Sequence, residues 1–230
     1  MMRTVQAMLF DLDGTLLDSA PDLVAALNWV RHGEGLPPLA LREMKRYASK
    51  GAVGLLKAGM PATDPATLET WRQRFLEHYA LNSCRHSTLF DGIPELLDLL
   101  DRRQVPWGIV TNKMEALTRP IVEGFGLEDR IGCMVCGDTL AESKPHPAPV
   151  VLACGIVGVE PHETLFVGDD LRDIQAGRAA GTQTAAVYYG YGSHELPDNP
   201  EGGSFPVHRP SDLERLIQEQ DGAPARQTHE

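Results

Sequence analysis

The sequence predicts an α/β fold, with a Rossmann-like parallel sheet that has helices on both faces and an all-helical segment inserted after the first strand. Short apolar runs alternate with helical patterns from residue 105 onward. This alternation implies parallel strands that are joined by right-handed crossovers. A long stretch without a strand separates the first apolar run from the others. The apolar runs lie at residues 5–10, 104–112, 132–135 and 164–167.

The first apolar run predicts a buried strand that ends in two aspartates, within Asp11-Leu12-Asp13-Gly14-Thr15. Strand alternation places Asp11 and Asp13 on the same side of the chain, and Gly14 lets the backbone turn beside whatever they hold. Two carboxylates this close repel each other, so we expect a cation there. The alternative is a simple strand-end turn, for which Asp and Gly are common residues.

A helical region follows the first strand. Its first helix is expected to begin near Ser19, which fits a capping box with Asp22, while Pro21 suits a first turn. No strand is expected from there to about residue 84. Further helices are expected at residues 40–48, 51–58 and 65–81.

This order of elements predicts the domain organisation. A helical domain at residues 17–86 lies between two parts of an α/β core domain, at residues 1–16 and 87–220. The polar tail at residues 221–230 is expected to be disordered. The later elements are a helix at 94–100, a helix after Asp173 that stops at Gly181, a strand at 182–189, a loop at 190–206 and a helix at 211–218.

Polar groups collect after the ends of the apolar runs. Thr111 and Asn112 end the second run, and Ser143-Lys144-Pro145 follows the third after a polar loop. The fourth run ends in the cluster Gly168-Asp169-Asp170-Leu171-Arg172-Asp173. Open α/β sheets bind ligands at the carboxyl ends of their strands. We therefore expect these residues to share one site with the two aspartates that follow the first strand.

Composition and charge narrow the class of protein. A chain of 230 residues with 42% hydrophobic and 23% charged residues suits a globular protein with a substantial core. The net charge of -11, with no evident basic patch, argues against binding to nucleic acid. A cytoplasmic protein without a membrane partner is expected, because the N-terminal residues lack a signal sequence and no window approaches a membrane span.

The cysteines are compatible with free thiols in a reducing compartment. Cys133 and Cys136 have the spacing of a redox motif or half of a zinc site, but no second pair accompanies them. They also overlap an apolar strand run. We therefore interpret them as core residues of a strand.

Four motifs occur together along the chain: DLDGT at residues 11–15, VTNK with Thr111, SKPHP with Lys144 and GDDxxD at residues 168–173. With this set the chain resembles the haloacid dehalogenase-like phosphohydrolase superfamily over residues 5–190. More narrowly, it is similar to phosphoglycolate phosphatases and the related N-acetylmuramic acid 6-phosphate phosphatases. The resemblance implies that the helical domain is a mobile cap, which would exclude water while a phosphate is transferred.

The residue types agree with a magnesium-dependent phosphomonoester hydrolase. Asp11 is expected to be the nucleophile that forms an aspartyl-phosphate. Asp13 would protonate the leaving alkoxide and later deprotonate the hydrolytic water. Asp169 would complete a site for Mg²⁺ with Asp11 and the backbone carbonyl of Asp13, since oxygen ligands suit this ion.

The phosphate group of the substrate requires hydrogen-bond donors that bind its oxygen atoms. Lys144 is expected to hold a phosphoryl oxygen, together with hydrogen bonds from Thr111 and the backbone around Asn112. One of Asp170 and Asp173 would contact metal-bound water or orient Lys144. Their alternative role is helix capping, because a helix begins there and acids are favoured at its amino terminus.

The substrate is expected to be a small phosphorylated metabolite that the cap selects. Ser49, Lys50 and Gly51 lie where related enzymes place a specificity loop, and Lys50 would meet a substrate carboxylate unless it is only an exposed lysine before a helix. The favoured reaction converts 2-phosphoglycolate to glycolate and phosphate. The alternatives are N-acetylmuramic acid 6-phosphate, whose lactyl arm also carries a carboxylate, or another small sugar phosphate.

Other classes of protein are less favoured. Dehalogenases and phosphonate hydrolases lack an acid at the position of Asp13, as the resemblance implies. A phosphomutase would need a cap that rebinds a sugar bisphosphate, for which no signature is recognisable. A noncatalytic binding protein could lose one acid without penalty, yet the acids and Lys144 are all present. A homodimer is compatible with the sequence, which carries no feature that decides the oligomeric state.

Overall fold

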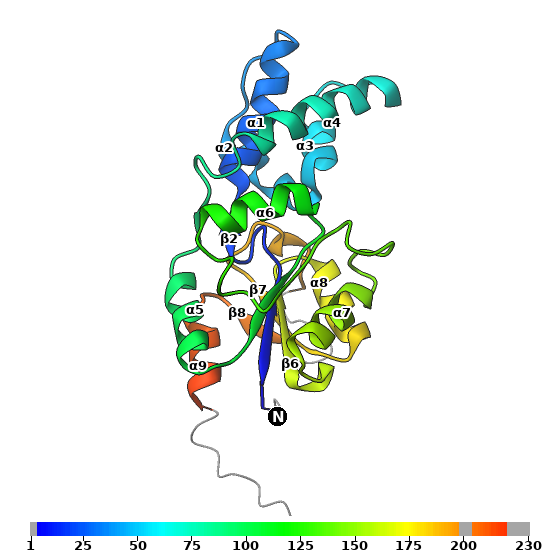
Figure 1. The fold of residues 1–230 in the computed structure, drawn as a ribbon. Helices are drawn as coiled ribbons and strands as arrows, with labels where there is room; N and C mark the ends of the chain where they lie inside the picture. The colour runs from blue at the N-terminus through cyan, green and yellow to red at the C-terminus, as the bar shows by residue number, and fades with distance from the viewer. Residues whose placement is uncertain (1–3, 198–203, 220–230) are drawn as a thin grey trace, which may run out of the picture.

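The computed structural model describes residues 4–197 and 204–219. Its centre is a six-stranded sheet in which all neighbouring strands are parallel, as the sequence predicts (Figure 1). In spatial order the strands are β5 (Cys133–Val135), β4 (Trp107–Val110), β1 (Ala7–Phe10), β6 (Thr164–Gly168), β7 (Gln183–Val187) and β8 (Phe205–Val207). Strand β1 therefore lies in the middle, where Met8 is opposite Trp107 of β4 and Leu165 of β6.

Helices cover both faces of the sheet. Figure 1 shows α5 (Ile93–Arg102) and α9 (Ser211–Glu219) on one side, with α7 (Ala148–Val157) and α8 (Leu171–Ala180) on the other. Side chains alternate between these faces along each strand. In β1, Phe10 joins the core that includes α5 and α9, whereas Leu9 joins the core that includes α7 and α8. Burial on both faces explains why these strands are continuous apolar runs.

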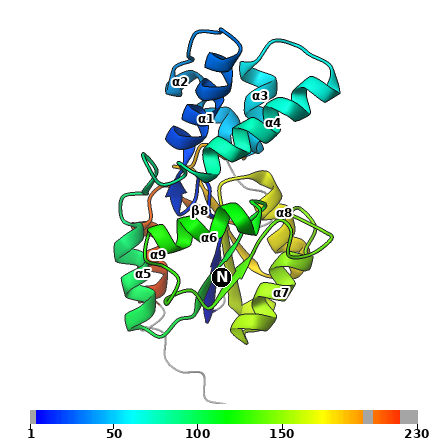
Figure 2. The same ribbon diagram turned by 45° about the horizontal axis from the view of Figure 1, so that its top comes forward.

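The segment between β1 and α5 forms a separate helical layer. Figures 1 and 2 show its helices gathered at one end of the sheet, above α6 (Glu115–Gly124). Division of the chain at residues 17 and 86 stays a prediction. In chain order the layer contains β2 (Leu17–Asp18), α1 (Ala20–Gly33), α2 (Leu41–Met44), a 3₁₀ helix (Lys45–Lys50), α3 (Gly51–Gly59), α4 (Pro65–Ala80) and β3 (Thr88–Leu89).

Short strands at the entry and exit of this layer were not expected from the sequence. Strands β2 and β3 pair antiparallel, so the chain leaves the core and returns to it side by side. Strand β8 (Phe205–Val207) begins inside the segment 190–206 that was expected to be a loop, and a 3₁₀ helix (Ser193–Glu195) precedes it. These elements are two or three residues long, which is too short for a periodic pattern.

The predicted capping box at the start of α1 is wrong. The Ser19 side chain makes no capping hydrogen bond, and its hydroxyl instead donates to Asp13. Asp22 accepts hydrogen bonds from the backbone amides of His86 and Ser87, at 3.0 and 2.9 Å. Asp22 thus ties α1 to the returning chain, because a buried carboxylate needs donors and these two amides supply them.

The cysteines are free thiols, three of them buried. Cys133 lies in β5, and burial raises the pKa of its thiol to about 12, which favours the protonated form. The interpretation as buried core residues is confirmed for both cysteines, but Cys136 follows the end of β5 and only Cys133 lies in the strand. Across the part of the chain that the structure describes, no helix is long and apolar enough to cross a membrane. The tail predicted at residues 221–230 lies outside the described residues.

Candidate active site

A cavity of about 290 Å³ lies between the carboxyl ends of the central strands and the helical layer. Asp11 follows β1, Thr111 follows β4 and Asp169 follows β6, so the parallel sheet brings them to one edge. The cavity is also lined by the other residues that the sequence analysis singled out: Asp13, Ser49, Lys50, Gly51, Asn112, Lys144, Asp170 and Asp173. The structure therefore places all the predicted site residues around one space.

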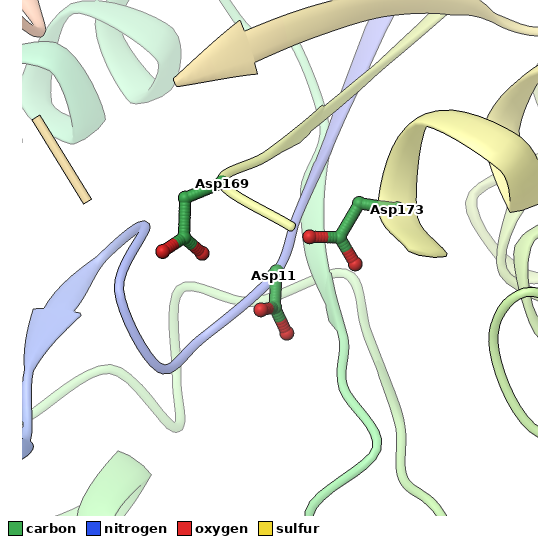
Figure 3. Close-up of side chains that lie close together, drawn as sticks. All are labelled: Asp11, Asp169 and Asp173. Atoms are coloured by element: carbon green, nitrogen blue, oxygen red, sulfur yellow. The ribbon is translucent and has the colours of Figure 1, made fainter. Parts of the chain in front are cut away.

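Three carboxylates form the acidic centre of this site. Figure 3 shows Asp11, Asp169 and Asp173 around a common space, and one oxygen atom of each lies within 4.8 Å of the others. All three residues are buried. The pKa of Asp169 is raised well above its ordinary value by burial and then by the charges of Asp11 and Asp173. A cation would favour the ionised form of these acids, so the donor set fits a divalent ion with oxygen ligands.

Lys144 supplies one positive charge to the acidic centre. Its Nζ lies 2.8 Å from Asp11 Oδ1 and 2.7 Å from Asp173 Oδ1, and donates a hydrogen bond to the carbonyl oxygen of Val110 at 2.7 Å. Burial lowers the pKa of Lys144, but Asp11 and Asp173 raise it more, so the ammonium stays charged. When all three carboxylates are ionised, one lysine leaves the cluster with excess negative charge.

The loop that carries Lys144 is held by Asn112. The Asn112 side chain donates to the carbonyl oxygen of Lys144 and accepts from its backbone amide, both at 2.9 Å. Thr111 is buried after β4, and its hydroxyl oxygen accepts a hydrogen bond from the amide of Lys113 at 3.2 Å. The side chain of Asn112 therefore fixes the lysine, while any contact of Asn112 with phosphate falls to its backbone.

Close backbone packing surrounds Asp169. Gly14 has a φ of 92°, and a Cβ atom there would lie 2.2 Å from Asp169 Oδ2. A Cβ atom on Gly190 would lie 2.3 Å from the carbonyl oxygen of Gly14. The Asp169 carboxylate also accepts hydrogen bonds from the amide of Gly192 at 2.7 Å and the hydroxyl of Thr15 at 3.2 Å. These contacts fix the carboxylate beside Asp11 and allow only glycine at the two turns.

Asp170 and Asp173 divide the two roles that the sequence left open. Together they form a capping box at the amino terminus of α8. Burial raises the pKa of Asp170, but hydrogen bonds from Arg172 outweigh it and lower the pKa. Asp173 accepts from Lys144 through Oδ1 and from the amide of Asp170 through Oδ2, at 3.0 Å. Helix capping therefore accounts for Asp170, whereas Asp173 both caps the helix and holds Lys144.

The helical layer reaches the site through the segment Ser49-Lys50-Gly51. Lys50 forms an ion pair with Glu195, and both side chains are more than one third exposed. Arg172 donates from Nη2 to the carbonyl oxygen of Ser49 at 2.7 Å. Two contacts therefore tie this segment to the core, and Lys50 lines the cavity while paired with a carboxylate of the same chain.

The general acid predicted at Asp13 has a partner that sequence reasoning missed. Lys113 Nζ lies 2.8 Å from both carboxylate oxygens of Asp13 and donates to the hydroxyl of Tyr79 at 2.9 Å. The only sequence signal for Lys113 is its position directly after Thr111 and Asn112. Tyr79, from α4, carries no signal that links it to the site.

The fold and this arrangement define an α/β protein with buried acids and a lysine at the carboxyl ends of parallel strands. A family model for haloacid dehalogenase-like hydrolases matches residues 8–187. The chain belongs to this family, as its motifs predict.

Relatives of known name agree with this assignment. An N-acetylmuramic acid 6-phosphate phosphatase from Pseudomonas aeruginosa is 42% identical over 212 residues, which cover 91% of this chain and 93% of the relative. A phosphoglycolate phosphatase from Xylella fastidiosa is 43% identical over 195 residues, which cover 85% of this chain and 84% of the relative. The crystal structure of a predicted phosphoglycolate phosphatase from Haemophilus somnus 129pt is 29% identical, with a TM-score of 0.83 over 95% of this chain and 100% of that one.

Proposed function

We propose that this protein is a magnesium-dependent phosphomonoester hydrolase that acts through an aspartyl-phosphate and converts 2-phosphoglycolate to glycolate and phosphate. The observation that carries the proposal is the buried group of Asp11, Asp169, Asp173 and Lys144 at the strand ends. Phosphatase relatives at 42–43% identity support it. The ester is a dianion, so the site must offset charge as well as provide a nucleophile.

In the first half-reaction, Asp11 attacks the phosphorus atom. Lys144 holds Oδ1 of Asp11, so we assign the attack to Oδ2. The bond from phosphorus to Oδ2 forms, the bond to the ester oxygen breaks, and Asp13 donates a proton to the leaving alkoxide. Lys144, the Thr111 side chain and the backbone at Asn112 would stabilise the phosphoryl oxygens.

In the second half-reaction, Asp13 accepts a proton from water, whose oxygen attacks the phosphorus atom. The bond from phosphorus to Asp11 Oδ2 breaks, which releases phosphate and restores the carboxylate. One side chain thus acts as acid and then as base, and the proton balance of the cycle closes on Asp13.

Magnesium would be held by the carboxylates of Asp11 and Asp169 and the backbone carbonyl of Asp13. The ion would offset the remaining negative charge of the site and of the phosphate. Both oxygens of Asp173 already accept hydrogen bonds, one from Lys144 and one from the amide of Asp170. We therefore assign Asp173 to positioning Lys144 rather than to the metal.

A second substrate is favoured by the apolar part of the cavity lining. This part includes Leu23, Val53, Phe75, Leu76, Met114 and Leu117. A two-carbon acid such as 2-phosphoglycolate has little surface to contact it, whereas N-acetylmuramic acid 6-phosphate carries acetyl and lactyl methyl groups. The relative from Pseudomonas aeruginosa bears the name of that activity.

Phosphate release from a panel of esters tests the proposal. The panel is 2-phosphoglycolate, N-acetylmuramic acid 6-phosphate, a sugar 6-phosphate and an aryl phosphate, each with Mg²⁺ and with a chelator. We expect turnover that requires Mg²⁺, and the largest kcat/KM identifies the substrate. No release from any ester would favour a noncatalytic protein, and transfer within a sugar phosphate would favour a mutase.

Lys50→Ala should raise KM for a carboxylate substrate by roughly tenfold, since a charge-assisted contact is lost. The aryl phosphate, which has no carboxylate, should change by less than about twofold. Steady-state kinetics with both substrates measure the difference. Lys57→Ala, which removes an exposed lysine on α3, is the matched control. Equal effects on both substrates would show that Lys50 serves only its ion pair with Glu195.

The partner in this proposal is a small phosphorylated metabolite, as the names of the relatives suggest. A cytoplasmic location and a homodimer stay predictions. Light scattering after size-exclusion chromatography measures the oligomeric state, and a mass near 25.2 kDa would exclude the dimer.

A further inference from the structure

Lys113 joins the predicted acid of the core to a helix of the helical layer. It follows β4, and its Nζ contacts both carboxylate oxygens of Asp13 and the hydroxyl of Tyr79, which lies in the last turn of α4. The ammonium group also lies 4.8 Å from the centre of the Tyr79 ring. The Lys113 side chain is only 7% exposed, although the cavity reaches it.

The contacts of Lys113 use its full donor capacity. An ammonium group has three N–H donors, and Asp13 Oδ1, Asp13 Oδ2 and the Tyr79 hydroxyl provide three acceptors at 2.8, 2.8 and 2.9 Å. A substrate could bind Lys113 only by displacing one of these acceptors. The arrangement therefore suits a residue that positions Asp13 rather than one that binds substrate.

Asp13 is held from the opposite side by Ser19. The Ser19 hydroxyl donates to Asp13 Oδ1 and lies 2.8 Å from the hydroxyl of Tyr191, so a second buried pair fixes the same carboxylate. Ser19 precedes α1 at the entry of the helical layer and Tyr191 follows β7, whereas Tyr79 belongs to α4. Among the contacts of Asp13 within the described residues, the one through Lys113 and Tyr79 links its orientation to the place of α4.

We propose that Lys113 and Tyr79 are positioning residues that orient Asp13 for proton transfer when α4 is seated over the strand ends. The inference rests on the proposed function, because it assumes that Asp13 protonates the leaving group. Proton transfer by Asp13 is then coupled to the position of the helical layer. When α4 does not lie over the strand ends, Lys113 loses its contact with Tyr79, and the Asp13 carboxyl group is no longer held in the same orientation. A positioned general acid contributes about 100-fold to 10,000-fold to a reaction, so its misplacement is measurable.

The dependence of the rate on the leaving group is the decisive measurement. Alkyl phosphates such as 2-phosphoglycolate need protonation of the leaving oxygen, whereas 4-nitrophenyl phosphate, whose leaving group is an acidic phenol, needs little. In single-turnover experiments, Lys113→Met should slow the alkyl ester by about 100-fold and the aryl ester by less than about fivefold. Asp13→Asn should also slow the alkyl ester more than the aryl ester, and its loss of rate should be larger. The loss in this variant is the largest that misplacement of Asp13 can cause.

Two matched controls accompany these variants. Lys57→Met removes an exposed lysine from α3, and Tyr188→Phe removes a hydroxyl that donates to the carbonyl oxygen of Pro197, away from the cavity. Both should leave both rates within about twofold of wild type. Tyr79→Phe keeps the ring over Lys113 and should slow the alkyl ester by roughly threefold to tenfold, in the range of one lost hydrogen bond.

Each outcome bears on the inference in a defined way. Equal slowing of alkyl and aryl esters by Lys113→Met, or a change confined to KM, would overturn it, because a structural or substrate-binding lysine gives those results. If Lys113→Met does not fold, the rates of Tyr79→Phe decide, and an alkyl rate equal to wild type overturns the inference. If the wild-type protein hydrolyses no ester, the proposed function is wrong, and the inference, which rests on it, is wrong as well.

Discussion

Asp11→Asn is expected to lower kcat by at least about 1,000-fold with every phosphomonoester, because the substitution removes the nucleophilic charge with almost no change of shape. In the proposed mechanism both half-reactions involve this carboxylate, so kcat should fall for every substrate. Trapping of the phosphoenzyme by acid quench should yield labelled protein from wild type and none from the variant.

The Asp11→Asn variant must fold for this comparison to hold. Its buried neighbours favour folding, since Lys144 keeps its contact with Asp173 and the acidic centre carries one charge less. Circular dichroism and thermal unfolding measure the fold, and Asp91→Asn on an exposed turn is the matched control. A folded Asp11→Asn protein with a kcat within tenfold of wild type would contradict the role of Asp11.

The central strands were predictable because burial on both faces of the sheet gives them a simple pattern in the sequence. Strands β1, β4 and β6 are buried on both faces, so they appear as continuous apolar runs that end in polar residues. Strand β8 lies at the edge of the sheet, contains Pro206 and spans three residues. Its pairing depends on β7 rather than on a pattern of its own, so the sequence alone predicts a loop there.

The site was predictable to the extent that it follows from topology. Parallel strands bring Asp11, Thr111 and Asp169 to one edge, so their position after apolar runs was sufficient to group them. The role of Lys113 depends on a contact with Tyr79, which lies in a helix of another layer. For Asp22 the sequence predicted a contact that does not form. Its spacing from Ser19 fitted a capping box, but its carboxylate accepts hydrogen bonds from the amides of His86 and Ser87 instead. Local patterns cannot reveal such contacts between segments that are distant in sequence.

Charge balance connects stability with catalysis at this site. Asp11, Asp169 and Asp173 are buried together, and burial, followed by the charges of Asp11 and Asp173, raises the pKa of Asp169. Among the described residues, Lys144 is the cation in direct contact with Asp11 and Asp173. The lysine and a bound divalent cation would therefore both stabilise the Asp11 carboxylate, and loss of one should increase the effect of the other.

Lys144→Met should lower the stability of the metal-free protein by about 3 kcal/mol or more, because two buried carboxylates lose their partner. For a domain of this size, that change lowers Tm by roughly 10 °C. It should also lower kcat by at least about 100-fold, since a charged donor to the phosphoryl oxygen is lost.

Thermal unfolding with and without Mg²⁺ separates the two effects of Lys144. We expect Mg²⁺ to raise the Tm of Lys144→Met more than that of wild type, because the ion binds the Asp11 carboxylate, which the lysine no longer neutralises. Lys57→Met should respond to Mg²⁺ as wild type does, since its lysine is exposed on α3. An equal or smaller Mg²⁺ response in Lys144→Met would mean that the ion and the lysine do not share a carboxylate. The metal would then have to lie away from Asp11, and the assignment of Asp11 as its ligand would be wrong.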